Sequence, residues 1–590
     1  MPFLLAPAGS PEGLRAALAA GADEVYLGGD TFNARINARN FGQKELIAAG
    51  DACKNNNVRL FITLNTLVSD RDFSALYDYI VFLENKVMPD AYIIQDVGLA
   101  VWLKKTFPNI IMHASTQMQQ HSSGGVRLLK ALGFSRIVLA REMSEEGIRA
   151  LCKQPVECEV FVHGALCVSM SGGCLMSSMI GKRSGNRGEC AQPCRLTYSG
   201  KNAYPLSLKD LCLAGHIPKL TEMGVTSLKI EGRMKSPDYV YAVTSIYRRL
   251  LDENRSATRQ EKDMLRAVFS RSGFTDGYFT GKTGSVMFGV RRESDKRQSR
   301  EVKVKGYSVS PRPVQPAATE SAPLLLPQKD HKSIIPANKQ KGYVFRYESV
   351  CPKEKTIKKY YELAARIDLP IWKIKTLVAI SEYADKVSVI LPRTVFDSDR
   401  DNIKKLLEYA YSKGIRQVTL SNIAHIELCA GFNLHGDYSL NVTNSETLSV
   451  LESLSFSSAL LSPETSPRFI QPSPLAKEYI VYGRIPLMQT ENCIIKNTGT
   501  ACGEDCGGTL IDRTNAAFPI KREYAHRSIV YNSVPIYIAD KIKELKKSGV
   551  GLYTLLYLDE HKNVEEFDRL IDLCVNKSPA AFPFTRGYYK

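Results

Sequence analysis

The sequence lacks the features of several large protein classes. No run of about 18 uncharged apolar residues occurs among its 590 residues, which argues against a membrane-spanning helix. The first residues, MPFLLAPAGSPEG, contain neither the basic nor the apolar segment of a secretory signal and suit a first strand that runs into a turn. These absences predict a cytoplasmic protein without a membrane partner. In that compartment, clustered cysteines bind metals more often than they form disulfides.

Common catalytic motifs and acidic residues are also scarce. The chain has no GxSxG and no HExxH motif, and its cysteines are crowded rather than single, so a nucleophilic hydrolase finds little support. Only 61 Asp and Glu face 78 Lys and Arg, which gives a net charge of +17. That surplus favours a polyanionic partner, RNA or DNA, and the alternative is a solvated basic surface.

Short β-rich runs alternate with stretches of helical periodicity in the first half of the chain. The predicted strands are 3–5, 24–27, 59–64, 91–95, 110–113, 136–140, 157–162 and 227–230. Eight parallel strands with crossover helices predict an α/β fold of the TIM-barrel type. An open doubly wound sheet is the weaker alternative, because no GxGxxG follows the first strand.

Polar residues just past the strands are candidates for a functional site, because the C-terminal ends of barrel strands surround the active site. The candidate catalytic residues chosen from this set are Arg35, Arg141, His163, Glu231 and Arg233. The alternative is a structural role, in which Arg141 pairs with Glu142, Arg233 pairs with Glu231, and the histidine is a hydrogen-bonding group at a strand end.

Four cysteines follow the seventh predicted strand within a glycine-rich stretch, Cys167, Cys174, Cys190 and Cys194. Four thiolates suit zinc or an iron–sulfur cluster. Structural zinc sites favour two close pairs, whereas only Cys190 and Cys194 are closely spaced, so the uneven gaps favour iron–sulfur. Reactive or structural thiols are the remaining alternative. Cys212 competes with Cys194 as the fourth ligand.

The second half of the chain repeats landmarks of the first in the same order. Residues 111–121 resemble 434–444, residues 138–142 resemble 460–464, and the FTDGYF of 274–279 returns as FTRGYY at 584–589. We therefore predict a TIM-barrel-like domain over 1–282 and a second, related barrel-like domain over 342–590. A basic, Pro- and Ser-rich linker over 283–341 joins them.

The second half also holds a partial cysteine set, with Pro486 at the position that corresponds to Cys167. Its candidate metal ligands are Cys493, Cys502, Cys506 and His526. Three thiols and an imidazole suffice for a tetrahedral zinc site, and a second iron–sulfur cluster is the other metal interpretation. The alternative is a decayed copy of the first site with an incidental histidine.

The segment EVFVHGALCVSMSGGCLMS, residues 159–177, resembles the signature of peptidase family U32, the collagenase-like peptidases. The opening LAPAGSPEGLRAALAAGADEVYLGG, the segment 33–41, GECAQPCR and SLKIEGRMKSPDYV are also similar to that family. The resemblance covers residues 1–282 strongly, and the second half resembles the C-terminal repeat of longer members.

The resemblance implies one of two activities. Some members are known as collagen-degrading peptidases, and others are needed for oxygen-independent hydroxylation of tRNA, ribosomal RNA or the ubiquinone ring. The hydroxylases carry a 4Fe–4S cluster, which by position would lie on Cys167, Cys174, Cys190 and Cys194, and the RNA enzymes are linked to prephenate as hydroxyl donor. For this chain the resemblance then implies that Arg35, Arg39, Arg141 and Arg233 hold a carboxylate or an RNA phosphate.

We predict an RNA hydroxylase that makes 5-hydroxycytidine or 5-hydroxyuridine in rRNA or tRNA, because the basic charge and the thiol cluster suit RNA modification better than proteolysis. The target base must then be unstacked or single-stranded to enter the barrel mouth. The alternatives are a U32-type peptidase and a non-catalytic RNA-binding protein with a structural metal.

Overall fold

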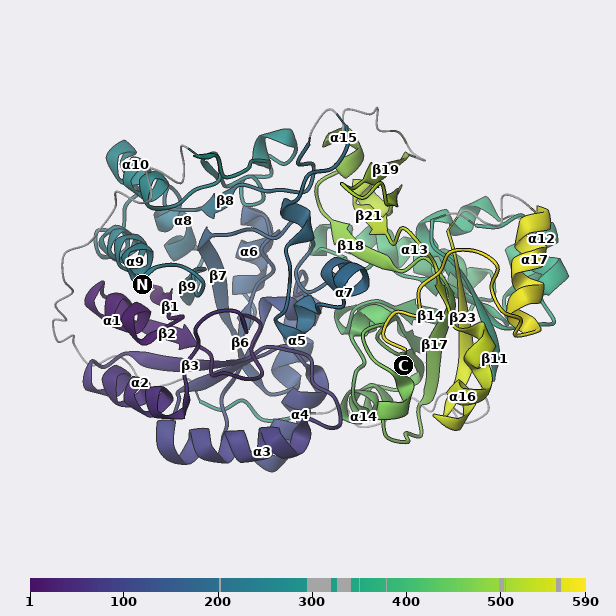
Figure 1. Cartoon of the computed structure of the whole chain (residues 1–590), viewed down its shortest axis with the longest axis horizontal. Coiled ribbons are helices and arrows are strands. Elements are labelled where there is room, and N and C mark those ends of the chain that lie inside the picture. Colours follow the sequence, from purple (N-terminus) through teal and green to yellow (C-terminus); the bar gives the residue numbers. More distant parts are fainter. Residues whose placement is uncertain are drawn as a thin grey trace.

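The chain folds into two eight-stranded parallel barrels that lie side by side (Figure 1). The structure is a computed structural model, and it describes residues 1–200, 203–293, 320–325, 341–349, 351–377, 379–497, 503, 506–558 and 564–589. The predicted pair of TIM-barrel-like units is confirmed.

The first barrel uses all eight predicted strand positions. Its strands are β1 (Phe3–Pro7), β2 (Glu24–Leu27), β3 (Arg59–Leu64), β4 (Ala91–Ile94), β5 (Met112–Ala114), β6 (Phe134–Val138), β7 (Glu157–Gly164) and β9 (Ser227–Ile230). Pairing of β9 with both β7 and β1 closes the sheet. Most strand residues are buried, because the barrel interior covers one face and helices cover the other.

Six of the nine outer helices of this barrel begin at a residue whose side chain caps the first turn. The nine helices are α1 (Pro11–Ala19), α2 (Gln43–Asn55), α3 (Phe73–Phe82), α4 (Val97–Thr106), α5 (Ser123–Ala131), α6 (Glu145–Cys152), α8 (Ile217–Glu222), α9 (Pro237–Asp252) and α10 (Arg259–Val268). Ser10, Ser144 and Ser236 each accept a hydrogen bond from a first-turn N–H group. These caps fix where each helix leaves the barrel rim.

The second barrel follows the same strand order. Its strands are β11 (Gly342–Tyr347), β12 (Ala364–Pro370), β13 (Val387–Ile390), β14 (Gln417–Leu420), β15 (Asn433–Gly436), β16 (Phe456–Leu460), β17 (Ala476–Gly483) and β23 (Val550–Tyr557). Its α-helices are α12 (Glu354–Tyr360), α13 (Arg400–Ser412), α14 (Ser445–Ser453), α16 (Ile542–Lys547) and α17 (Val564–Val575). Pairing of β17 with β16 and β23 closes this sheet.

The two barrels differ in the segment that comes after the seventh strand. After β7 comes the cysteine-bearing segment with the short helix α7 (Met176–Gly181), whereas after β17 comes a four-stranded antiparallel sheet. That sheet contains β18 (Pro486–Thr490), β19 (Gly507–Ile511), β20 (Ala517–Arg522) and β21 (Ser528–Tyr531), with α15 (Ile494–Asn497) between its first two strands. This insertion lies at the junction of the barrels, where β18 contacts α7 (Figure 1).

The internal repeat extends to the short strands outside each barrel. β8 (Asp210–Cys212) pairs antiparallel with β7. On its other side β8 pairs parallel with β10 (Phe274–Thr275), which begins the FTDGYF motif. β22 (Ile536–Tyr537) pairs antiparallel with β17, and Ile536 bridges to Thr585 of FTRGYY. The two motifs therefore occupy equivalent places.

The helix caps correct the alignment of the halves by one residue. Gln119 and Asn441 both adopt the left-handed conformation, with φ of 57° and 56°, just before the caps Ser122 and Asn444. Residues 111–121 therefore match 433–443 rather than 434–444. In this register His113 of β5 corresponds to His435 of β15.

Both barrels bury charged side chains in their interior. In the first, Arg136 lies between Glu24 and Glu159, 2.9 Å and 3.3 Å from their carboxylates. In the second, Arg366 bonds to Asp368 and Glu478 at 2.6 Å and 2.9 Å. Such buried charges are tolerated because each has an opposite charge in contact.

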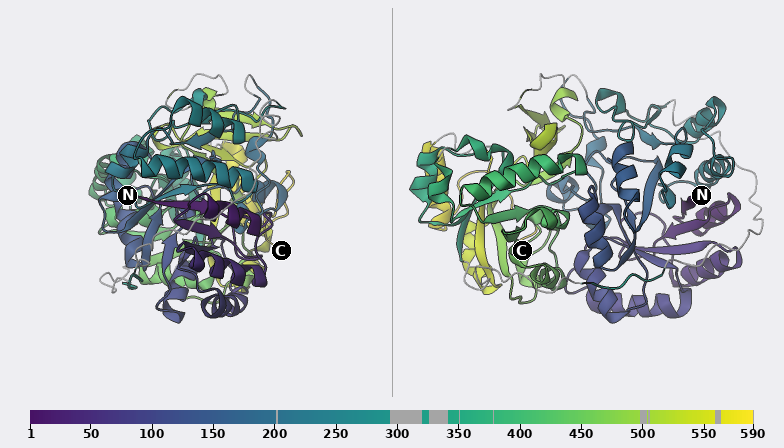
Figure 2. Two further views of the ribbon diagram at one scale, coloured as in Figure 1. Left: turned by 90° about the vertical axis from the view of Figure 1, so that its left-hand side faces the viewer. Right: turned by 180° about the vertical axis from the view of Figure 1, so that it is seen from behind.

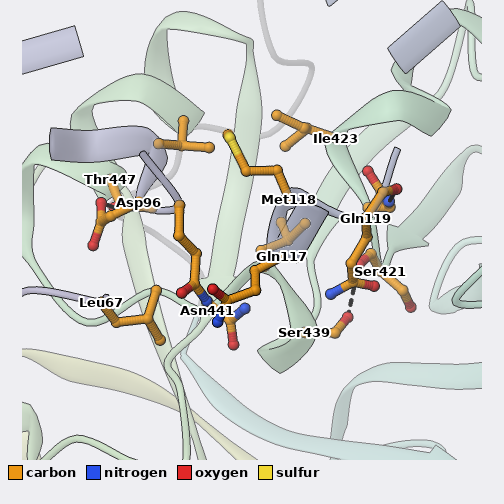
Figure 3. A pocket seen from close by; sticks show the side chains of 14 residues that line it. Leu67, Asp96, Gln117, Met118, Gln119, Ser421, Ile423, Ser439, Asn441 and Thr447 are labelled. Carbon is orange, nitrogen blue, oxygen red and sulfur yellow. Dashed lines mark hydrogen bonds between the residues drawn. The ribbon is translucent and has the colours of Figure 1, made fainter. Parts of the chain in front are cut away.

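The barrels meet through equivalent elements, and each element packs against the counterpart of its neighbour in the other barrel. Helix α4 packs on α14, and α5 packs on η10 (Ile423–Leu428), which is the counterpart of α4. A polar cavity of about 50 Å³ lies between them, lined by residues 95–97 and 117–119 and by their counterparts 421–423 and 439–441 (Figure 3). Asn444 donates a 2.8 Å hydrogen bond to Asp96 across this junction. The interface thus has the pattern of an isologous twofold contact within one chain, and the view from behind shows the same pairing of barrels (Figure 2).

The predicted linker, 283–341, lies mostly outside the described residues. Of its described part, residues 320–325 run against the first barrel, where Leu325 N donates to Ala131 O at 2.6 Å. Within the described ranges, no helix is both long and apolar enough to cross a membrane.

Candidate functional site

A cavity of about 690 Å³ opens at the C-terminal end of the first barrel. All four cysteines of the first set line it, and so do Arg35, Arg141, Glu231 and Arg233. The structure therefore places these eight residues, chosen from the sequence, around one cavity. His163 is the exception among the first-barrel candidates.

Two glycines shape the entry of the cysteine segment into the mouth. Gly164 ends β7 with φ of 109°, and a Cβ there would lie 2.6 Å from the carbonyl oxygen of Glu231. Gly172 has φ of 76°, and a Cβ would lie 2.1 Å from Gln117 O. Only glycine fits both the left-handed backbone and these close approaches. The segment therefore passes close to the backbone of Glu231 and Gln117 as it crosses the barrel mouth.

The four thiols share one wall of the cavity. Burial raises the pKa of Cys174, and the other three cysteines raise it further. Burial, followed by Cys167 and Cys190, raises the pKa of Cys194 to about 12. Each thiolate raises the pKa of its neighbours through charge repulsion. A bound metal cation would remove that repulsion.

The donor set fits an iron–sulfur cluster in kind, because four thiols and no imidazole line the cavity. In the described part of the chain, however, no three or more His, Cys, Asp or Glu side chains are already grouped around a single metal position. Cys212 lies on β8 outside the cavity lining, with its sulfur 3.8 Å from the Tyr247 hydroxyl. The structure therefore groups Cys194, and not Cys212, with the other three thiols.

Arg233 is a buried cation without a carboxylate partner in the described structure. Its side chain donates to three neutral oxygens, those of Thr63 at 3.1 Å, Asn33 at 3.0 Å and Asn40 at 2.7 Å. Its Nε atom has no hydrogen-bond partner among the described residues, and burial lowers its pKa to about 10. The expected alternative, a pair with Glu231, is not formed, because Arg35 makes that contact at 3.4 Å.

Arg141 also lacks an ion pair with any described residue. Its guanidinium lies 6.0 Å from the centre of the Phe161 ring, and its Nε has no described partner. Glu142, the alternative partner, bonds instead to His121 at 2.7 Å. Arg39 lies outside the cavity lining and pairs with two surface glutamates.

Positive charge dominates the cavity. Eight basic side chains line it, and Glu231 is the single acidic one among the described lining residues. The basic residues are Arg35, Arg141, Arg195, Lys229, Arg233, Lys235, Arg271 and Arg291. Sequence reasoning did not single out five of these, although Lys229 and Lys235 flank Glu231 and Arg233 at the end of a predicted strand. An excess of this size suits an anionic ligand.

His163 does not reach the cavity, although we predicted it as catalytic. Its ring is packed among Tyr239, Tyr247 and Phe274, with centroid distances of 5.2 to 6.1 Å. Burial lowers its pKa to about 3, and Nδ1 lies 3.3 Å from the Tyr247 hydroxyl. It therefore occupies a structural position behind the wall.

The second barrel holds the cysteine segment from outside. Leu175 N donates to Leu487 O at 2.6 Å, and Met170 N donates to Gln489 O at 2.8 Å, which ties the segment to β18. Asn186 donates to Glu464 at 2.8 Å. The side chain of Met488, between the two β18 carbonyls, lines the cavity itself. The site is thus built by both barrels.

The second cysteine set is only partly described. Cys502 lies outside the described residues, whereas Cys493 precedes α15, Cys506 precedes β19, and His526 is exposed after β20. Since the described residues contain no ready metal group, the second metal site stays a prediction.

Comparison with known proteins agrees with the architecture. The model of peptidase family U32 matches residues 9–287 and 361–553, which is most of both barrels. The chain belongs to peptidase family U32.

The relatives of this chain are named for two kinds of activity. The chain is 38% identical to tRNA hydroxylation protein P1 of Bacillus subtilis over 42% of this chain and 63% of that one. It is 37% identical to a 23S rRNA 5-hydroxycytidine synthase of Escherichia coli over 48% of this chain and 43% of that one. It is 33% identical to a collagenase of Porphyromonas gingivalis over 47% of this chain and 73% of that one.

Proposed function

We propose that this protein hydroxylates a pyrimidine base in rRNA or tRNA without dioxygen, in the cytoplasm. The observation that carries the proposal is one cavity that combines four thiols with eight basic side chains and a single acid. Relatives named for tRNA hydroxylation and for 5-hydroxycytidine synthesis in rRNA support it. Each of those two matches spans less than two thirds of the relative, so the activity itself is the proposal.

We assign the four first-barrel cysteines, Cys167, Cys174, Cys190 and Cys194, to a 4Fe–4S cluster. When bound, the cluster would supply the redox chemistry that amino acid side chains lack. The chain's own contribution is to hold the thiols at the mouth through Gly164, Gly172 and the backbone bonds to β18.

The reaction needs an oxygen donor. Hydroxylation replaces a ring C–H bond by a C–O bond, so the base loses two electrons and a proton and gains a hydroxyl group. The donor loses that hydroxyl group as its own C–O bond breaks, and takes up the two electrons and the proton. We assign the donor to a small carboxylate, prephenate by family resemblance. Arg233 and Arg141 support this, because both line the cavity without a described carboxylate in contact and can donate paired N–H groups to one.

The test is the nucleoside content of RNA from a strain that lacks the gene. We expect loss of one nucleoside that is heavier than its parent by one oxygen, detected by mass spectrometry of rRNA and tRNA digests. The intact gene should restore it, a Cys212→Ser gene should restore it, and a Cys174→Ser gene should not. A deletion strain that keeps every hydroxylated nucleoside would overturn the proposal.

A peptidase is the second candidate, because one relative is named a collagenase. The described lining of the cavity contains thiols but no histidine, so no thiol–imidazole pair is formed there. We therefore expect no gelatin cleavage by the pure protein. Cleavage that is abolished by Cys167→Ala and persists without iron would favour the peptidase.

The third candidate is a non-catalytic RNA-binding protein with a structural metal. It predicts that Cys174→Ser leaves both RNA binding and the hydroxylated nucleoside unchanged. Loss of the nucleoside with RNA binding retained would exclude it.

A further inference from the structure

Three basic side chains surround one aromatic ring at the rim of the cavity. Lys235 Nζ lies 2.9 Å from the centroid of Phe269, and the guanidinium carbons of Arg291 and Arg271 lie 4.2 Å and 5.4 Å from it. All four side chains line the cavity and are partly exposed. We call these four residues the Phe269 cluster.

Positive charge is concentrated in the cluster. The buried Asp210 is paired with Arg271. Lys235 forms no ion pair with any described residue and contacts the rings of Phe269 and Tyr239. Burial lowers the pKa of Lys235 to about 8, and repulsion from Arg271 and Arg291 contributes to this shift because the three cations are close together. Like charges held together at a cavity rim are typical of anion sites.

The cluster lies on the same side of the mouth as Cys194. The next residue, Arg195, also lines the cavity and donates to Leu166 O at 2.7 Å and to Ser207 Oγ at 3.0 Å. On another side, Arg35 lies near Cys190. Within this one cavity Arg233 is buried, whereas the residues of the Phe269 cluster are partly exposed.

We propose that the Phe269 cluster binds a backbone phosphate of the substrate strand and so places the neighbouring base over the thiols. This inference rests on the proposed function in that it takes RNA as the substrate. A phosphate offers several charged oxygens to cations that approach from different directions, and a partly exposed rim admits a polymer that the enclosed Arg233 position excludes. The aromatic ring holds the three cations in place by cation–π contact.

The test is the salt dependence of binding to a short single-stranded oligoribonucleotide, with iron-loaded full-length protein. The variant Lys235→Gln/Arg291→Gln keeps the Arg271–Asp210 pair and so preserves the buried carboxylate's partner. We expect about tenfold weaker binding for every sequence tested, and a slope of log affinity against log salt that is shallower by about 0.7 for the one phosphate lost. Lys235→Arg should retain both properties.

The control is Lys54→Gln, an exposed lysine at the far end of α2, which should bind like the unchanged protein. Equal melting temperatures of the variants exclude loss of folding as the cause. An unchanged affinity and slope in the double variant would overturn the inference. If the double variant weakened the binding of inorganic phosphate but left RNA affinity unchanged, the assignment of the cluster to RNA would be wrong.

The same experiments separate this inference from the proposed function. RNA binding that depends on the cluster, in a protein whose deletion leaves all hydroxylated nucleosides intact, would uphold the phosphate site and reject hydroxylation. If the deletion removed the hydroxylated nucleoside but the double variant kept the salt slope of the unchanged protein, hydroxylation would be upheld and the phosphate site rejected.

Discussion

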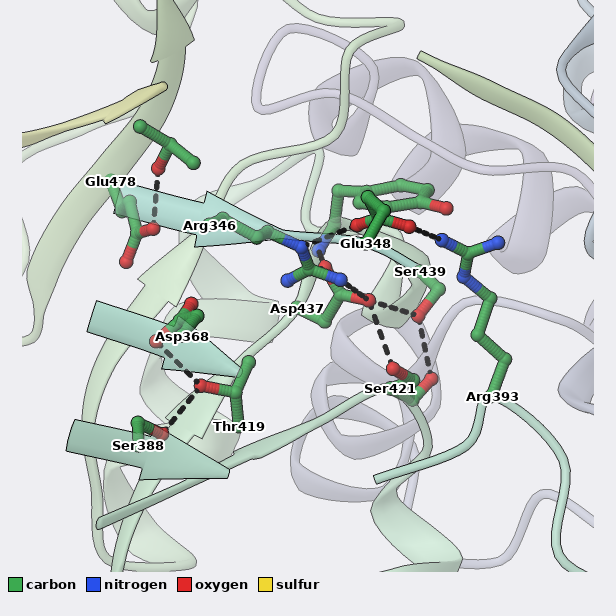
Figure 4. A network of polar contacts seen from close by, with 12 residues as sticks. Arg346, Glu348, Asp368, Ser388, Arg393, Thr419, Ser421, Asp437, Ser439 and Glu478 are labelled. Carbon is green, nitrogen blue, oxygen red and sulfur yellow. Dashed lines mark hydrogen bonds and ion pairs between the residues drawn. The ribbon is translucent and has the colours of Figure 1, made fainter. Parts of the chain in front are cut away.

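The mouth of the second barrel is filled by ion pairs where that of the first is open. Arg346 bonds to Glu348 at 2.6 Å and to Asp437 at 2.8 Å, and Arg393 bonds to Glu348 at 2.8 Å (Figure 4). The cavity beside Arg393 measures only about 20 Å³. In the first barrel, by contrast, Arg233 has three neutral partners and faces about 690 Å³ of space.

The difference shows how one scaffold serves two roles. In the second mouth, burial raises the pKa of Glu348, but Arg346 and Arg393 outweigh it, so the carboxylate stays ionised and both arginines are ion-paired with it. In the first mouth, Arg141 and Arg233 have no carboxylate in contact among the described residues, which costs free energy unless a ligand supplies the anion. We therefore expect the ligand at the first mouth, and a supporting role for the paired network of the second.

The largest expected effect concerns iron. Cys174→Ser should abolish iron and acid-labile sulfide in protein purified without oxygen, because it removes one of four thiols on a shared wall. Cys493→Ser, in the second half, should retain the first-barrel cluster. Equal loss of iron in both variants would place the cluster outside the first mouth and remove the contrast between the barrels.

The next effect concerns stability. Arg346→Met should lower the free energy of unfolding by about 3–5 kcal/mol, because it leaves the buried charge of Asp437 unpaired and removes one of the two arginines that pair with Glu348. Arg233→Met should cost about 1 kcal/mol or less, because the desolvation of an unpaired cation disappears with it. Denaturant titration measures both, and a larger loss for Arg233→Met would contradict the distinction between paired and unpaired mouths.

A smaller effect is expected at the junction of the barrels, where equivalent helix caps differ. Asn444 caps α14 and also donates to Asp96 across the interface, so Asn444→Ala should cost about 2–3 kcal/mol. Its counterpart Ser122 only caps α5, so Ser122→Ala should cost about 1 kcal/mol. Equal costs, measured by thermal unfolding, would show that the cross-barrel hydrogen bond contributes nothing.

The smallest effect is a pH dependence confined to the first mouth. Burial and the neighbouring Arg271 and Arg291 lower the pKa of Lys235 to about 8, against the attraction of Glu231 and Asp210. Lys235 then loses its proton in the folded state above pH 8 but keeps it in the unfolded chain to about pH 10.4, so stability rises with pH in that window. Anion affinity should fall over the same range.

The check is oligoribonucleotide binding at pH 7 and pH 9 with unchanged protein and Lys235→Gln. We expect the decrease in affinity to be smaller in the variant. An identical decrease would assign the pH dependence to another group.

Much of the first site could be predicted from the order of strands along the chain. The ends of the predicted strands placed Arg35, Arg141, Glu231 and Arg233 at one mouth, because parallel barrel strands all point their C-terminal ends to the same side. The rule also placed His163 at the mouth, whereas the last residues of β7 pair with β8 and turn that side chain into an aromatic layer. It also missed Arg271 and Arg291, which approach the mouth from segments beyond the eighth strand.

The one-residue shift between the repeats has a similar cause. Residue similarity alone matched 111–121 to 434–444, whereas left-handed Gln119 and Asn441 and the caps after them define the register. Backbone conformation at these positions depends on where each helix must start on the barrel. Residue identity alone indicates that conformation only weakly.

The sequence by itself determined the two barrels, their repeat and the clustering of cysteines after the seventh strand, because periodic burial and motif order are local properties of the chain. Only the tertiary structure decided which charges are paired, which of Cys194 and Cys212 joins the other thiols, and that β18 of the second barrel forms part of the wall of the first. Those outcomes depend on contacts between residues up to several hundred positions apart, and no local pattern encodes them.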